Sequence, residues 1–368
     1  MHRQQGFSMI DVMVGIVIAL VAMLVIFHVF SVGEQFKRNT TAIGDAQVSG
    51  LLASFMLGLQ LANAGNALAA AAHDLAACED QSAEPDLTKR FAQSWRPIPI
   101  LVFDGGAAAA PDSFAVHYST STTIVAPAQA VAASPGKYVV RSPNGFHPLV
   151  KGERKDLIVA IQNAPFGAAG PCAAARVDAA VPSMAAPCTA AQGCVELAYT
   201  GAALPGTPYS VFNMGAADDV QKIAYDVDTA KTVLRSTRLV DDQGRLAREA
   251  PNPIASNIVN LKLQYGIDTN ADGLLDAWVS ATGAWAPDVL LSAATPVATL
   301  NQIKAVRIGV IVRSEQFDKT YTQDVGWSMF DGAFAGTFAR SVAPSGNWRY
   351  RVYETVIPLR NGIWNKSL

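Results

Sequence analysis

A chain of 368 residues is long enough for roughly two domains. Half of the residues are hydrophobic and only 16% are charged, which is low for a cytosolic protein. A net charge of −2 provides no basic face to neutralise phosphates, so the composition argues against nucleic-acid binding. The apolar content also argues against a disordered chain.

The N-terminus predicts a retained membrane anchor. Residues 1–6 form a short leader, and residues 7–30 are almost entirely apolar. About 20 apolar residues are enough for a helix to cross a membrane. A secretory signal has an apolar core of only about 7 to 15 residues, followed by a cleavage site between small side chains. The run at 7–30 is longer and lacks that site, so we expect a single-pass transmembrane helix.

Asp11 is the unusual residue in this run, because it places a carboxylate among apolar side chains. A charge at the centre of a membrane helix costs about 2.5–3.5 kcal/mol on insertion scales, and less near an end. Such a residue is a functional candidate by default. The alternative is that Asp11 lies at the membrane interface and stays hydrated.

The string GFSMIDVMVGI at residues 6–16 resembles the class III signal of type IV pilins. The resemblance implies that a prepilin peptidase cuts after Gly6 and that Phe7 becomes a methylated N-terminus. It also implies that Asp11 meets the terminal amine of an adjoining subunit and sets the register of assembly. The family nearly always has Glu at this position, so the carboxylate of Asp11 reaches one methylene less far.

Orientation also follows from the resemblance, because the charges flanking the anchor are nearly balanced. It implies an inner-membrane protein with its head in the periplasm, which later reaches the pilus tip at the cell surface.

Residues 31–65 predict an amphipathic continuation of the same helix, ending at the Asn-Ala-Gly-Asn run of 63–66. This second half can pack under a sheet, and four glycines predict kinks or breaks in it, namely Gly33, Gly44, Gly50 and Gly58. Its large apolar residues recur at steps of three or four, and they are Phe36, Ile43, Val48, Leu51, Leu52, Phe55 and Leu59.

Residues 66–368 predict one β-rich head, which can contain two sublobes. Alternating patterns predict half-buried strands at 259–267 and 304–313, and a last strand at 350–359 that ends near Pro358. Shorter strands are expected at 98–103, 113–118, 137–141, 156–161, 194–199, 221–227 and 232–240. The fold class is therefore α+β, and the resemblance to type IV pilins implies a pilin-like arrangement, with a long N-terminal helix on an antiparallel sheet. Long Ala-, Gly- and Pro-rich surface loops are expected at 105–111, 126–136, 164–187 and 201–208.

The four cysteines predict disulfides in an oxidising compartment, because they are even in number and follow a membrane segment. They lack CxxC spacing and nearby histidines, which argues against a zinc site. Three connectivities stay open, as does the alternative of free buried thiols. The candidates are Cys78, Cys172, Cys188 and Cys194.

A second motif follows the strand that ends at Ile267. Acidic and amide residues alternate there and a glycine is the sixth residue, as at the start of a calcium loop. The candidate calcium ligands are Asp268, Asn270, Asp272, the carbonyl of Leu274, and Asp276. The twelfth position is Val279 and not Glu, so any site is weaker than an EF-hand. The alternative is a metal-free hairpin loop held by Asx turns.

Three segments resemble the head of PilW-type minor pilins: LQYGIDTNADGLLDAW at 263–278, IKAVRIGVIVRS at 303–314 and YRVYETVIPLRN at 350–361. The Ala-rich middle, roughly 105–210, has no such resemblance. The resemblance implies a tip complex that primes pilus assembly. Its implied partners are other minor pilins, the major pilin, prepilin peptidase and a PilY-family adhesin.

No catalytic residues are predicted. The chain has no GxSxG, HExxH or P-loop motif, and its five histidines lack metal-ligand spacing. We therefore expect a protein that is not an enzyme. Two alternatives to a minor pilin stay open: a minor pseudopilin of a type II secretion system, and a membrane-anchored periplasmic binding domain outside any filament.

Overall fold

The computed structural model describes residues 8–363 except for short internal stretches. These stretches are 69–74, 76–77, 79–83, 122–126, 142–145, 147–155, 163–169, 184–187, 189–192, 202–205, 209, 242–243 and 293.

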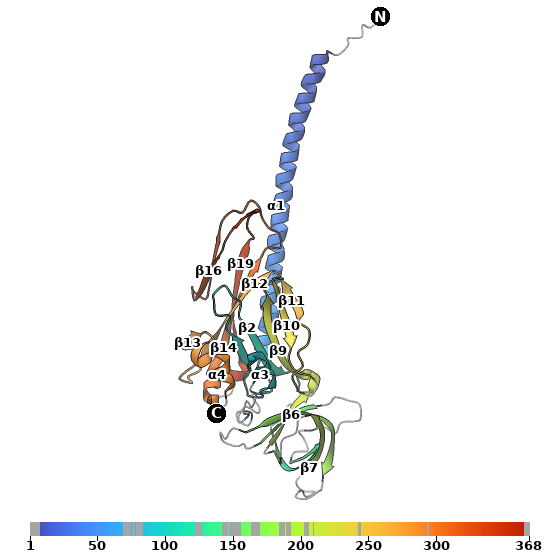
Figure 1. Cartoon of the computed structure of the whole chain (residues 1–368), viewed down its shortest axis with the longest axis vertical. Helices are drawn as coiled ribbons and strands as arrows, with labels where there is room; N and C mark the ends of the chain where they lie inside the picture. The colour runs from blue at the N-terminus through green and yellow to red at the C-terminus, as the bar shows by residue number, and fades with distance from the viewer. Residues whose placement is uncertain are drawn as a thin grey trace.

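One helix, α1 (Met9–Asn63), forms the long axis of the molecule (Figure 1). Ser8 caps its start, where the side-chain oxygen accepts a hydrogen bond from the backbone N–H of Ile10 at 3.3 Å. The helix ends at the predicted stop signal. The prediction of breaks at the glycines is wrong, because α1 is continuous through all four of them. Its first half projects alone, and the head lies against its second half (Figure 1).

The head is built from antiparallel strands and a few short helices, which confirms the α+β class. The first sheet has the order β1-β2-β9-β10-β11, and the second has the order β13-β12-β14-β19. The bounds of the strands in these two sheets are β1 (Ile100–Phe103), β2 (Ser113–Ser119), β9 (Val220–Asp228), β10 (Val233–Arg238), β11 (Asn252–Ser256), β12 (Ile258–Ile267), β13 (Ala277–Val279), β14 (Ile303–Arg313) and β19 (Tyr350–Pro358). The other elements outside the middle of the chain are α3 (Leu87–Gln93), η4 (Ala217–Asp219), η5 (Gly283–Trp285), α4 (Pro287–Leu291), α5 (Val297–Asn301), α6 (Arg360–Ile363) and the hairpins β15 (Val325–Met329) with β16 (Phe334–Phe338) and β17 (Ser341–Val342) with β18 (Ser345–Gly346).

The middle of the chain forms a closed six-stranded barrel at the end of the molecule farthest from the N-terminus (Figure 1). Its order is β3-β4-β7-β6-β5-β8, and its strands are β3 (Ala128–Ser134), β4 (Lys137–Arg141), β5 (Asp156–Ile161), β6 (Cys172–Ser183), β7 (Cys194–Gly201) and β8 (Ser210–Ala216). The loop predictions at 126–136 and 164–187 are therefore wrong, because β3 and β6 occupy much of them. Small interior side chains suit a narrow barrel, so alanines such as Ala173 and Ala175 face a core with the stacked Tyr138 and Tyr199 rings.

The inner strands of the second sheet, β12 and β14, are covered on both faces. On one face, Leu261, Leu263 and Tyr265 of β12 join the principal core with α1 and the first sheet. On the other face, the β15–β16 hairpin supplies Trp327 and Met329, which pack on Ile311 of β14. The expectation of a half-buried β12 is wrong for this reason, since its polar residues are buried as well, namely Asn260, Lys262 and Gln264.

The second half of α1 packs on the head through small side chains over residues 42–53 and through two leucines, Leu57 and Leu61, near its end. Its buried residues recur at steps of three and four: Ala42, Ala46, Gly50, Ala53, Leu57 and Leu61. Small residues let the helix axis approach the sheet closely, which is how Tyr353 of β19 comes to lie against Gly50. The predicted helix is present, but most of the large apolar residues predicted as its packing face lie on exposed faces.

Gly50 provides a test of this close approach. A Cβ atom added at Gly50 would lie 2.3 Å from Cε2 of Tyr353, whereas one added at Gly58 of the same helix meets nothing within 4 Å. Overpacking costs about 1–3 kcal/mol, and removing a helical glycine gains about 0.5–1 kcal/mol. We expect Gly50→Ala to lower the free energy of unfolding and Gly58→Ala to raise it, as measured by chemical denaturation in detergent. Stabilisation by both changes would contradict the packing.

Candidate functional site

The N-terminal part of α1 is long and apolar enough to cross a membrane, by length and composition. Asp11 lies in its first turn, where a carboxylate is favourable beside the positive end of the helix dipole. Its side chain is exposed, as are its apolar neighbours. Gly6 and Phe7, the predicted cleavage and methylation residues, lie outside the described residues. The geometry leaves Asp11 able to pair with a group outside this chain.

An apolar stripe continues along α1 beyond the length needed to cross a membrane. We define it as Val48, Leu51, Leu52, Phe55 and Leu59, which are 66%, 61%, 44%, 68% and 49% exposed. The stripe lies on the exposed part of the helix. Its side chains are large, whereas the face that contacts the sheet is made mostly of small residues. Contiguous exposed apolar surface of this kind is typical of an interaction site.

The acidic loop of residues 268–276 joins β12 to β13. It brings Asp268, Asn270, Asp272 and Asp276 into one short turn, where all but Asp268 are exposed. Asp268 is only 2% exposed. Among the described residues there is no group of three or more His, Cys, Asp or Glu side chains already arranged around a common point. The candidate metal ligands in this loop also include two uncharged oxygen atoms, the side-chain amide oxygen of Asn270 and the backbone carbonyl oxygen of Leu274.

The cysteines form two disulfides, Cys78–Cys172 and Cys188–Cys194. The first joins the chain after α1 to the first residue of β6, across 94 residues of sequence. The second joins Cys188, in the connection between β6 and β7, to Cys194, the first residue of β7, six residues later in the sequence. One bond therefore fastens the barrel to the rest of the head, and the other acts within the barrel.

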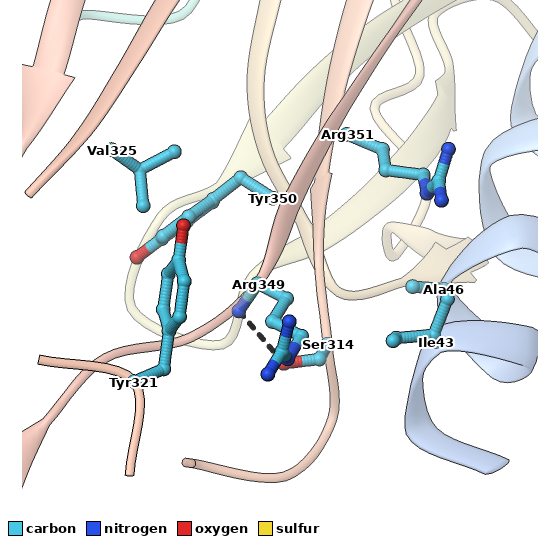
Figure 2. Close-up of a pocket in the computed structure, with 8 residues that line it drawn as sticks. All are labelled: Ile43, Ala46, Ser314, Tyr321, Val325, Arg349, Tyr350 and Arg351. Carbon is cyan, nitrogen blue, oxygen red and sulfur yellow. Dashed lines mark hydrogen bonds between the residues drawn. The ribbon is translucent and has the colours of Figure 1, made fainter. Parts of the chain in front are cut away.

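A pocket of about 240 Å³ lies between α1 and the start of β19 (Figure 2). Arg349 holds one wall: its guanidinium pairs with Asp318 at 2.9 Å and lies over the Tyr321 ring, and its backbone N–H donates to Ser314 Oγ at 3.1 Å. The pocket is lined by Ile43, Ala46, Ser314, Tyr321, Val325, Arg349, Tyr350 and Arg351. These contacts of Arg349 hold the start of β19 beside the end of β14.

Among the residues that the structure describes, two lysines of the head are fully buried. Lys262 pairs with Asp112 at 2.7 Å, and burial raises the pKa of the Asp112 carboxyl, although hydrogen bonds from Lys262 and from the backbone oppose the rise. Lys222 donates to the carbonyls of Phe91, Ala92 and Ser94, and burial lowers its pKa to about 7. Lys222 thereby connects β9 to the C-terminal end of α3, and Lys262 connects β12 to the segment between β1 and β2.

Sequence reasoning missed the small-residue face of α1 and the buried pair of Lys262 and Asp112. The first has a signal in the sequence, since Ala46, Gly50 and Ala53 recur at helical spacing. The second has none, because Lys262 occupies an ordinary polar position in an alternating strand and Asp112 lies far away in the sequence.

One comparison with known proteins gives a match. The family model described as Type IV Pilus-assembly protein W, PilW, matches residues 224–361. This region contains β12, β14 and β19, which contact α1 or share its core. No curated protein matches the chain, and no solved structure matches it. The match covers less than half of the chain, and this similarity over residues 224–361 supports a PilW-type type IV pilus protein involved in pilus assembly.

Proposed function

We propose that this protein is a minor pilin, processed by prepilin peptidase after Gly6, which joins the tip complex that primes type IV pilus assembly. The observation that carries the proposal is the PilW match at residues 224–361. The strands of this region share one core with α1, so the matched region and the anchor belong to the same body. A pilin-like arrangement, in which a long helix lies on an antiparallel sheet, fits this placement.

The exposed surface of α1 supports assembly into a filament. The apolar stripe (Val48, Leu51, Leu52, Phe55 and Leu59) continues the apolar character of the anchor toward the head. Helices packed side by side would bury this surface, at about 25 cal/mol for each Å² of apolar area. In this proposal Asp11 pairs with the terminal ammonium of an adjoining subunit, because a buried charge requires a partner. The head lies in the periplasm and then at the pilus tip, where a PilY-family adhesin is the proposed partner.

The experiment that tests this proposal is mass spectrometry of the N-terminal peptide, on protein taken from its native membranes. We expect a peptide that begins at N-methylated Phe7. A peptide with an intact Met1 would overturn processing, and it would favour a membrane-anchored binding domain that never enters a filament. Purification partners separate the remaining alternative: pilins and a PilY-like adhesin support the pilus, and secretion components would support a pseudopilus.

Asp11 provides the matching prediction. Removal of one partner from a buried charge pair costs about 3–5 kcal/mol, so we expect Asp11→Ala to reduce this protein in sheared pili by at least about tenfold. Asp11→Glu retains the carboxylate and should retain assembly. Asp45→Ala, on an exposed and more distal part of α1, is the control and should behave as wild type. Normal incorporation of Asp11→Ala would contradict the proposed pairing.

A further inference from the structure

We propose that the loop between β12 and β13 binds one calcium ion. The ligands are Asp268, Asn270, Asp272, the backbone carbonyl of Leu274, and Asp276. Oxygen donors at these alternate positions, with a glycine at the sixth, match the order in which calcium loops present their ligands. The inference concerns the folded head and does not rest on the proposed role in a pilus.

Asp268 is the residue of the loop whose surroundings favour a bound cation. Its backbone N–H donates to the carbonyl of Gln302 at 2.9 Å, which fixes the residue at the end of β12. Its Oδ2 accepts a hydrogen bond from the backbone N–H of Gly273 at 3.0 Å, so the carboxylate faces across the loop. Its Oδ1 is buried and has no hydrogen-bond partner. An unpartnered buried carboxylate oxygen is unfavourable, and a cation within the loop would satisfy it.

The rest of the loop is folded so that its oxygens lie on one turn. Asn270 Oδ1 accepts from the N–H of Asp272 at 3.0 Å, and Asp272 Oδ1 accepts from the N–H of Leu274 at 2.7 Å. Gly273 has a φ of +89°, which side-chain-bearing residues rarely adopt, and this conformation lets the chain turn back. Asp276 closes the loop by accepting from the N–H of Thr269 at 2.7 Å.

The three carboxylates are not yet gathered around one point, because Asp272 and Asp276 are exposed and bonded to the loop itself. Binding therefore requires these two exposed side chains to turn inward, while Asp268 is already in place. A set of oxygen ligands with three negative charges selects a hard cation. Calcium tolerates an irregular set of six to eight oxygens, whereas magnesium demands a near-ideal octahedron.

The affinity should be modest. Val279 stands where an EF-hand has a bidentate Glu, and strands flank the loop instead of a helix pair. The site therefore belongs with extracellular calcium modules, whose dissociation constants are on the order of 10⁻⁴ to 10⁻³ M.

Calorimetry on the full-length protein in detergent tests the proposal, after treatment with a chelator and with calcium chloride as the titrant. We expect one saturable site per chain, and a weaker or unsaturable response to magnesium chloride. Asp268→Asn keeps the shape and an oxygen for Gly273 but removes the charge, so calcium affinity should fall by at least about tenfold. Asp104→Asn is the matched control, since Asp104 also accepts from a turn N–H, that of Gly106 at 2.7 Å, outside the loop.

The outcomes are separable. If Asp268→Asn loses its cooperative thermal unfolding, the variant is not folded and cannot be interpreted. The variant Asp276→Asn, at an exposed position, then takes its place and should also lower the calcium affinity. Absence of a calcium response in the folded wild-type protein would overturn the proposal. Unchanged binding by the folded loop variants would also overturn it, because calcium would then bind elsewhere.

Discussion

Lys262→Met is expected to lower the free energy of unfolding by about 3–5 kcal/mol, because it leaves a buried carboxylate without its counterion. The Lys262 side chain is 0% exposed and that of Asp112 is 2% exposed, with 2.7 Å between Nζ and Oδ1. Asp112 also accepts from the backbone N–H groups of Gly105 and Leu263, both at 3.0 Å. These bonds fasten the segment between β1 and β2 to β12, an inner strand of the second sheet.

The matched control is an ion pair of the same length on the surface. Lys137 and Glu196 are also 2.7 Å apart, but their side chains are 50% and 28% exposed. Solvent-exposed pairs contribute about 0–1 kcal/mol, so Lys137→Met should have little effect on stability. Chemical denaturation of both variants, in detergent and monitored by tryptophan fluorescence, compares a buried pair with an exposed one at equal distance.

A double-mutant cycle distinguishes the pair from the two side chains taken separately. Asp112→Ala alone leaves Lys262 as an unpaired buried cation, and it should also be strongly destabilising. The double variant Lys262→Met with Asp112→Ala removes both charges, so its loss of stability should be clearly smaller than the sum of the two single losses. Strict additivity would show that the two charges do not stabilise the fold as a pair.

The sequence predicted those elements that are fixed by local pattern. The long apolar run and the Asn-Ala-Gly-Asn stop signal placed the helix close to its observed bounds, Met9–Asn63. The predicted strands at 137–141 and 156–161 coincide with β4 and β5. The predicted end of a strand at Ile267 is also observed, and residues 268–276 form the loop to β13, whereas calcium binding by this loop stays a prediction. In each case, the residues that carry the signal are neighbours in the chain.

Features that depend on distant partners could not be predicted in this way. Alanine is depleted in strands in general, so the Ala-rich segments that form β3 and β6 had the composition of loops. Their alanines become favourable only when the barrel closes around them. Lys262 looked like a solvent-facing residue because its partner, Asp112, lies 150 residues earlier in the chain. The buried face of α1 is an intermediate case, because Ala46, Gly50 and Ala53 recur at helical spacing in the sequence, but the close packing of Tyr353 on Gly50 depends on a distant strand.

Replacement of Cys78 and Cys172 by serine is expected to destabilise the protein more than the same replacement of Cys188 and Cys194. A cross-link stabilises mainly by restricting the unfolded chain, and this effect grows with the length of the loop that it closes. The sequence separations are 94 and 6 residues. The chain-entropy relation gives about 4–5 kcal/mol for the longer loop and about 2–3 kcal/mol for the shorter one.

The position of Cys78–Cys172 in the fold should increase the difference between the two disulfides further. Cys78 and Cys172 belong to the hydrophobic cluster between the barrel and the rest of the head, together with Leu75, Trp95 and Phe212. Loss of this bond should therefore also make the connection between the barrel and the head more open to limited proteolysis, whereas loss of Cys188–Cys194 should act within the barrel. Chemical denaturation of the two double variants measures the loss in the free energy of unfolding that each disulfide's removal causes. Equal losses of stability would contradict the loop-length argument, because they would mean that local contacts, and not restriction of the unfolded chain, determine what each disulfide contributes.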